Sequence, residues 1–155
     1  MRLQLVGVAI LSAAAASGGI EHTILHGVSV GRVRAWVGPE AIPDFSTERL
    51  HAIAASRLSE AGIPVRDGGQ AALTLAVEVH NDSGTCFVTI EGKLIESAKL
   101  ERNGMSVAAA SWHDGASVIA AVPECAGHTT RAVESVLGDF IETYRAMNPG
   151  RVGGE

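Results

Sequence analysis

Histidines and carboxylates are the residues here best suited to acid–base or metal chemistry, and one such pair stands together. In the stretch SWHDG, His113 precedes Asp114, and an imidazole oriented by a carboxylate can serve as a general base. Adjacent residues seldom make that hydrogen bond, and no G-x-S-x-G motif or activated cysteine accompanies them. A loop flanked by glycine explains the stretch without catalysis. We therefore predict no catalytic residue, and keep as the alternative a small hydrolase or metal-dependent enzyme using His113, Asp114 or His80.

The other histidines and acidic residues form no recognisable metal site. His22 and His26 are four residues apart, which would place both on one face of a helix. They precede a β-rich stretch, however, where a solvated arm is the simpler interpretation, and His80 falls on the outward side of a predicted strand. Nothing in the sequence brings together two of the obvious carboxylates, which are Asp44, Glu48, Glu78 and Glu91. The sequence predicts neither a metal site nor a cofactor.

The N-terminal stretch MRLQLVGVAILSAAAASGG has the organisation of a secretory signal peptide. Arg2 supplies the positive charge, residues 3–11 an apolar run and residues 13–17 small side chains, so we expect cleavage near Ala16. The apolar run is shorter than the roughly 20 residues that cross a bilayer. We assign residues 1–18 to the signal and expect a periplasmic or secreted protein. The alternative is a buried strand or helix that opens the fold.

Export gives the two cysteines, Cys86 and Cys125, a structural role. Outside the cytosol thiols oxidise and stay oxidised, and an even count in a small exported domain favours one disulfide between them. Closing a loop of about forty residues would stabilise the fold by about 4 kcal/mol in the chain-entropy model. The competing interpretation is two unrelated buried thiols. Their spacing fits neither a C-x-x-C redox motif nor a structural zinc site.

Length and composition indicate one exported domain. A chain of 155 residues suits a single core, and with 46% hydrophobic but only 4% aromatic residues that core must be aliphatic. The net charge of −5 and the absence of a Lys or Arg run argue against nucleic-acid binding. We expect a domain over residues 19–148, no membrane span, and a flexible tail over residues 149–155.

Apolar spacing in the first half predicts a strand, a helix and a second strand. A strand over about residues 28–37 changes phase at Gly31, where a bulge would let both apolar sets face the core. Ser46 or Thr47 could cap the helix that follows, and Gly62 offers its left-handed end. The helix presents one apolar stripe, formed by Leu50, Ile53, Ala54, Leu58 and Ala61. Strict alternation over residues 71–80 predicts the next strand.

The second half predicts two more strands and a long helix. After the turn NDSG, a strand begins at Thr85 with Cys86 on its inward side. The Asn103-Gly104 pair is typical of a two-residue type I′ hairpin turn. That turn would place Leu100 opposite Val107, Ala98 opposite Ala109, and Ile95 opposite Trp112.

A loop over residues 113–117 and a short apolar segment then lead to the last element. Val133, Val136, Leu137, Phe140, Ile141 and Tyr144 repeat at helical spacing and predict a helix over about residues 129–147. The predicted order, β-α-β-β-β-α, suggests a right-handed parallel crossover followed by an antiparallel meander. We therefore predict an α+β two-layer sandwich, with a four-stranded mixed sheet and two helices on one face. In this arrangement the disulfide pins the start of the last helix onto the sheet.

The outward side of this sheet is the predicted interaction surface. Its large apolar members are Trp36, Phe87, Ile95 and Trp112. A contiguous patch holding both tryptophans would be unusual for a solvated face, and such patches mark interfaces. The alternative is a flank covered by the N-terminal arm or by residues 113–117.

The order of elements, with LSEAGIPV closing the first helix and ALTLAVEV following it, resembles small periplasmic domains of bacterial envelope assembly. The lipopolysaccharide-assembly lipoprotein and the N-terminal domain of the Tol-Pal propeller protein are examples. The likeness spans about residues 28–147 and implies a non-catalytic binding or accessory role for the outer sheet face. A protein or another envelope component is the expected partner. A homodimer with packed sheet faces is a further possibility.

Overall fold

The computed structural model describes residues 25–40 and 42–150, so the predicted signal peptide and residues 151–155 lie outside the described part. The elements are β1 (Val30–Val37), α1 (Thr47–Glu60), β2 (Ala71–Asp82), β3 (Thr85–Lys99), β4 (Ser106–Ala121) and α2 (Val122–Met147). The strands form one sheet in the order β1-β2-β3-β4. In the described ranges, no helix is sufficiently long and apolar to span a bilayer.

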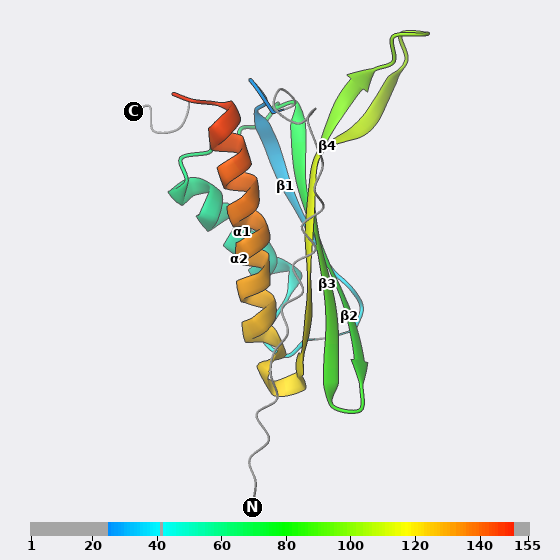
Figure 1. Ribbon diagram of the computed structural model, residues 1–155, viewed down its shortest axis with the longest axis vertical. Coiled ribbons are helices and arrows are strands. Elements are labelled where there is room, and N and C mark those ends of the chain that lie inside the picture. The colour runs from blue at the N-terminus through cyan, green and yellow to red at the C-terminus, as the bar shows by residue number, and fades with distance from the viewer. Residues whose placement is uncertain (1–24, 41, 151–155) are drawn as a thin grey trace, which may run out of the picture.

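The sheet is mixed and carries both helices on one face (Figure 1). β1 pairs with β2 in parallel, across the α1 crossover, whereas β2, β3 and β4 pair antiparallel. The inward positions of β2, Leu73, Leu75 and Val77, are fully buried beneath the helices. The predicted α+β sandwich is therefore confirmed, with its core between the sheet and the helix layer.

The residues that begin and end α1 are those that the sequence predicts. Ser46 is the N-cap, and its hydroxyl accepts the Arg49 N–H at 3.2 Å. After the C-cap, Gly62 adopts a φ of 70° and the Ile63 N–H donates to the Leu58 carbonyl at 2.9 Å. Ile63 is buried against the core, so the end of α1 is fastened by both a hydrogen bond and packing.

The predicted bulge in β1 is also present. The β1–β2 register shifts between Val30 and Arg32, which leaves Gly31 unpaired in the ladder. A Cβ built at Gly31 would lie 2.3 Å from the Gly69 carbonyl oxygen, so the two glycines allow a backbone approach that no other residue permits. Val30 is fully buried before the bulge, and Val33 packs partly against the core after it.

The start of the described chain is tied to the end of α2. The Tyr144 hydroxyl donates to the Val28 carbonyl at 3.0 Å, and the buried Asn148 side chain donates to the Leu25 carbonyl at 2.9 Å. His26 lies at 2.8 Å from the Met147 carbonyl through its Nδ1. His26 itself is exposed, as the predicted solvated arm implies, but its segment is packed on the helix end and is not a free arm. His22 lies outside the described residues.

The turn between β3 and β4 differs from the prediction. A type I′ turn needs positive φ at both central residues, but only Gly104 has it, at 69°. Instead, the Leu100 N–H donates to the Met105 carbonyl and the Gly104 N–H to the Leu100 carbonyl, which makes a longer loop. The predicted partners of Leu100, Ala98 and Ile95 were therefore wrong. The observed Cα partners are Ala98 with Val107, Glu96 with Ala109, Ile95 with Ala110 and Leu94 with Trp112.

Two predicted boundaries near the C-terminus are also corrected. Residues 113–117, predicted as a loop, continue β4 without interruption and pair with β3. The last helix begins at Val122 rather than near residue 129, with a proline in its first turn, where a missing N–H costs nothing. Cys125 consequently lies inside the first turns of α2, not ahead of the helix.

Candidate functional site

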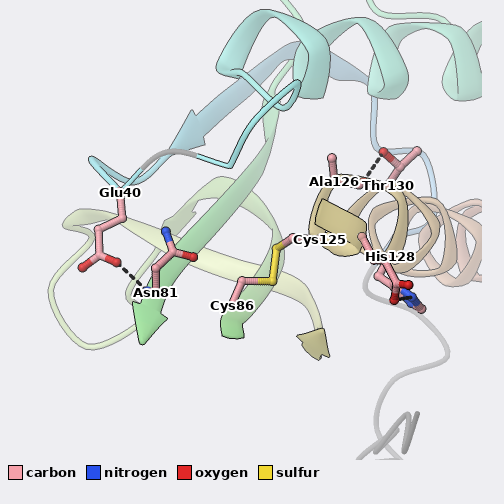
Figure 2. The surroundings of a disulfide bond; sticks show 8 residues. Glu40, Asn81, Cys86, Cys125, Ala126, His128 and Thr130 are labelled. Carbon is pink, nitrogen blue, oxygen red and sulfur yellow. Dashed lines mark hydrogen bonds and ion pairs between the residues drawn. A yellow bond between two sulfur atoms is a disulfide. The ribbon is translucent and has the colours of Figure 1, made fainter. Parts of the chain in front are cut away.

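The disulfide between Cys86 and Cys125 joins the two layers at one end of the sandwich (Figure 2). The Cα atoms are 6.3 Å apart, and both residues are almost fully buried. The Val122 N–H also donates to the Gly84 carbonyl at 3.0 Å, close to the same junction. The predicted bridge is therefore confirmed, and it holds the beginning of α2 on the beginning of β3.

A second tie secures the same end of the sheet. The Asn81 N–H donates to Glu40 Oε2 at 2.7 Å, and Asn81 is the pairing partner of Cys86 (Figure 2). His80 Nδ1 lies 3.4 Å from the other carboxylate oxygen. The hydrogen bond from the Asn81 backbone, with smaller help from His80, lowers the pKa of Glu40. Glu40 thus acts as an ionised clamp for the end of β2.

The residues of the alternative enzyme hypothesis are not brought together. His113 points to the outer face, where its Nε2 lies 3.1 Å from Glu91 Oε1, and Asp114, its neighbour in the same strand, points to the helix side. His113 pairs with Lys93, which pairs with Thr74. His80 is six positions further along β2, about 20 Å away at 3.3 Å per residue. Among residues 25–40 and 42–150, no three metal-ligating side chains cluster.

The four carboxylates named as acid–base candidates lie on separate elements. Asp44 is in the loop before α1, Glu48 in α1, Glu78 in β2 and Glu91 in β3. Glu91 forms a small ionic group with Lys93 and His113, and its oxygen lies 2.6 Å from Lys93 Nζ. The hydrogen bond from Lys93 is the main reason why the pKa of Glu91 is lowered. A carboxylate held ionised in this way is a poor proton donor at neutral pH.

One carboxyl pair lies where β4 meets α2, with Asp139 at an exposed position of the helix. Asp114 of β4 meets Asp139 of α2, and burial raises the pKa of Asp139, followed by its hydrogen bond with Asp114 and repulsion from Asp114 and Glu142. A raised pKa means that the folded state binds the Asp139 proton more tightly than the unfolded chain does. Asp139 therefore favours folding least at neutral pH, where the charged form must be accommodated, and this penalty disappears as the pH falls below about 4.

We expect Asp139→Asn to stabilise the protein at pH 7 and to leave its stability unchanged near pH 3. Urea unfolding followed by circular dichroism at both pH values measures the difference. Glu134→Gln removes one negative charge from the same helix away from Asp114 and serves as the control. An equal effect of Asp139→Asn at both pH values would show that the carboxyl pair does not titrate as described.

The outer face of the sheet holds three of the four residues predicted to form an interaction surface. Trp36 is 47% exposed and Phe87 42% exposed, while Ile95 is half-buried on the same face. Trp112 is the exception. It pairs with the inward-facing Leu94, and its ring lies edge-on to Phe140 of α2, with ring centroids 5.0 Å apart. The predicted outward position of Trp112 was wrong.

A β-bulge on β4 explains the reversal of Trp112. The β3–β4 register shifts between Leu94 and Ile95, whose partners are Trp112 and Ala110, so Ser111 is an extra residue on β4. One inserted residue exchanges the two faces of a strand, because side chains alternate with a period of two. The Asn-Gly pair does not indicate this bulge, and the change of phase between Ala109 and Trp112 was not recognised because a loop was predicted over residues 113–117.

A hollow of about 630 Å³ lies on the outer face beside Ile95. Arg32 and Arg34 of β1 line it, with Ala72 of β2 and Ala108 of β4. Arg32, Arg34 and Trp36 occupy alternate positions of one strand, so two exposed guanidinium groups and an exposed indole follow one another along its outward side. Asp67 and Glu96 line the same hollow beside the arginines, so the arrangement can hydrogen-bond polar groups of either charge and stack on planar ones.

Sequence reasoning missed part of this face. Ile119 is 56% exposed and pairs with Phe87, which in turn pairs with His80. The exposed position of Ile119 was not predicted, because residues 113–117 were expected to be a loop. The alternation of inward and outward side chains in β4 was therefore not followed beyond that stretch. The alternation of Trp112, Asp114, Ala116, Val118 and Ala120 on one side was the signal that could have revealed the strand.

Comparison with known proteins identifies a shared fold. No family model and no curated protein matches this chain. A solved structure of a PelC variant, a dodecamer from Paraburkholderia phytofirmans, is similar to it with a TM-score of 0.50 and 21% identity, over 84% of this chain and 96% of that one. A second PelC dodecamer from the same organism has a TM-score of 0.48 and 20% identity, over 84% of this chain and 94% of that one. At this identity the likeness describes the architecture.

Proposed function

We propose that this chain is an exported, non-catalytic binding protein of the bacterial cell envelope, which uses the outer face of its sheet to hold a protein or another envelope component. The observation that carries the proposal is the one-sided layering of the fold. Both helices pack on one face, and the opposite face presents Trp36, Phe87 and Ile119 as exposed apolar side chains among the described residues. The resemblance to envelope-assembly domains gives the same expectation.

The disulfide supports the exported location. A buried, structural cross-link between Cys86 and Cys125 is typical of proteins that fold in an oxidising compartment, such as the periplasm or the extracellular space. The signal peptide expected over residues 1–18 would deliver the chain to that compartment.

We further propose that several copies of the chain assemble. The solved PelC structures of similar architecture are dodecamers, and a sheet with two free edges offers surfaces for repeated association. Multiple copies would present the outer face many times, which raises the avidity for a repetitive or membrane-associated partner. A binding face and assembly edges are separate parts of the same sheet.

We expect the double substitution Trp36→Ser and Phe87→Ser to abolish capture of an envelope component without unfolding the protein. Both side chains are about half exposed, so the loss of stability is about 1 kcal/mol or less, whereas two anchors at the centre of an interface are each worth about 2 kcal/mol or more. The measurement is a quantitative pull-down from bacterial envelope extract, with captured components identified by mass spectrometry.

Ala146→Ser, at an exposed position of α2, is the control for this pull-down. A component captured equally by the wild type, the control and the double variant does not use the outer face. If every captured component behaves in this way, the proposed binding face is wrong. Loss of capture in the double variant alone, with an unchanged thermal midpoint, supports it.

A further inference from the structure

The ends of β3 and β4 project beyond the helices as a two-stranded arm, which we define as residues 95–110 (Figure 1). The bulge at Ser111 lies at the base of this arm, where the ribbon bends away from the sandwich. The helix-facing side of the arm carries an apolar stripe, formed by Ala98, Leu100, Met105, Val107 and Ala109, with Glu96 at its base.

This apolar stripe does not pack against the core of its own chain. The half-buried apolar residues that do so on β4, Trp112, Ala116 and Val118, all follow the bulge. Met105 at the tip of the arm is 58% exposed. A two-stranded ribbon with an uncovered apolar side has little stability of its own in water. The arm therefore gains stability from a surface that covers it.

A complementary groove runs along the opposite edge of the sheet, between β1 and α1. Its two connected parts measure about 480 and 520 Å³ and share Val33 and His51. The lining residues found in the described ranges belong to β1, α1 and the segment after α1, which places the groove on the free side of β1. Ala55, Ile63, Pro64 and Val65 make the first part mainly apolar. The second part is mixed, since Arg34, Thr47, Glu48 and His51 line it beside Val33 and Ala35.

The backbone of β1 is open in the middle of the strand, since at its start the Arg66 N–H already donates to the Val30 carbonyl at 3.0 Å. β1 is an edge strand with β2 as its neighbour, so alternate residues direct their N–H and C=O groups away from the sheet. The Val37 N–H points to this free side, where it donates to the Thr47 hydroxyl at 3.2 Å. By the same alternation, Ala35 and Val33 present their backbone groups next to the groove. A strand that docks there gains main-chain hydrogen bonds as well as apolar contact.

The charges of the arm do not oppose docking. Residues 95–110 hold two acidic and two basic residues, Glu96, Glu101, Lys99 and Arg102, so the arm has no net charge. β1 contains Arg32 and Arg34 and no acidic residue. A neutral arm therefore meets no net repulsion at the β1 edge, whereas two copies of the β1 edge would repel each other.

We infer that the arm of one copy docks in the β1–α1 groove of the next copy, extending the sheet from subunit to subunit. This inference rests on the self-assembly proposed above and assigns its surfaces. The helix-facing stripe of the arm then covers the groove, because the docked arm continues the sheet with the same face toward α1. Arm and groove are different surfaces on opposite edges, so the interface is head-to-tail and closes into a ring when the rotation between copies allows it.

The test uses two single substitutions in the full, disulfide-bonded chain. Val107→Glu places a charge on the apolar side of the arm, and Ala55→Glu places one in the exposed wall of the groove. Ala108→Glu, the next residue on the opposite face of the arm, is the matched control. Light scattering after size exclusion measures the mass, and circular dichroism with a thermal midpoint verifies that each variant is folded.

The wild type and Ala108→Glu are expected to have the same multi-chain mass, while Val107→Glu and Ala55→Glu each have the mass of one chain. An equimolar mixture of these two variants is expected to give the mass of two chains, because one intact arm meets one intact groove. If Val107→Glu and Ala55→Glu keep the wild-type mass, or if their mixture stays at one chain, the assigned surfaces are wrong. A wild type that remains a single chain overturns the proposed assembly itself.

Discussion

Removal of the Cys86–Cys125 disulfide is expected to lower the free energy of unfolding by about 4 kcal/mol. The bond closes a loop across a sequence separation of 39 residues, and the unfolded chain gains this much conformational freedom when the loop opens. Small domains are stable by about 5–15 kcal/mol, so the reduced protein would retain only part of its stability. Guanidinium unfolding with and without a reductant measures the loss.

The double variant Cys86→Ala/Cys125→Ala separates the bond from other effects of the reductant. Its free energy of unfolding should be close to that of the reduced wild type, and slightly lower because two buried sulfur atoms are lost from the core. The reductant should not change it. Alkylation of the wild type should modify two thiols after reduction and none before. A change of less than about 1 kcal/mol on complete reduction would contradict the stabilising role given to the bond.

The position of the disulfide also predicts which part of the protein opens first after reduction. Cys125 lies near the beginning of α2, whose N-cap Ala121 makes no side-chain hydrogen bond. The bond and the Val122 N–H contact to Gly84 add to the direct continuation from β4 and to the packing of Val122 and Ala126 in holding this helix start on the sheet. Reduction should therefore raise amide exchange first at the beginning of α2, before the middle of the helix, where Phe140 and Leu137 are buried.

Regular patterns made most of the fold predictable from sequence. β2 alternates strictly and α1 has one apolar stripe, and in both elements the residues of the apolar pattern are those that the core buries. The local pattern therefore predicts the tertiary position correctly. The disulfide was predictable because the chain has two cysteines and the sequence predicts an export signal. Gly62 and Gly31 were also informative, since each occupies a position that other residues cannot easily take.

The errors came where residue composition suggested a loop but tertiary pairing decided otherwise. Gly115 and its polar neighbours resemble a turn, yet β3 supplies a partner for every residue of this stretch. A proline and a glycine near Cys125 hid the first turns of α2, although proline is well suited to the first turn of a helix. The bulge at Ser111 corresponds to a change of phase in the apolar positions of β4, from Val107 and Ala109 to Trp112 and Val118, but the loop predicted over residues 113–117 concealed it.

Substitution of Trp112 by Ala is expected to destabilise the protein by about 3 kcal/mol. The indole packs edge-on against Phe140, and Gly92 provides the space for it, because a Cβ at that position would lie 2.9 Å from the Trp112 ring and from Val136. Removing a large ring from a contact of this kind leaves a cavity that the sheet and α2 cannot easily close. Guanidinium unfolding followed by circular dichroism measures the change.

Trp36→Ala is the matched control, since it removes the same side chain from the outer face. Trp36 is about half exposed and faces away from α2, so its loss should cost less than about 1 kcal/mol. The remaining indole in each variant also reports its environment, and Trp112 should fluoresce at a shorter wavelength than Trp36. Equal destabilisation by the two substitutions would mean that Trp112 does not join the sheet to α2. The outer face would then hold both tryptophans, and the bulge at Ser111 would have to be absent in solution.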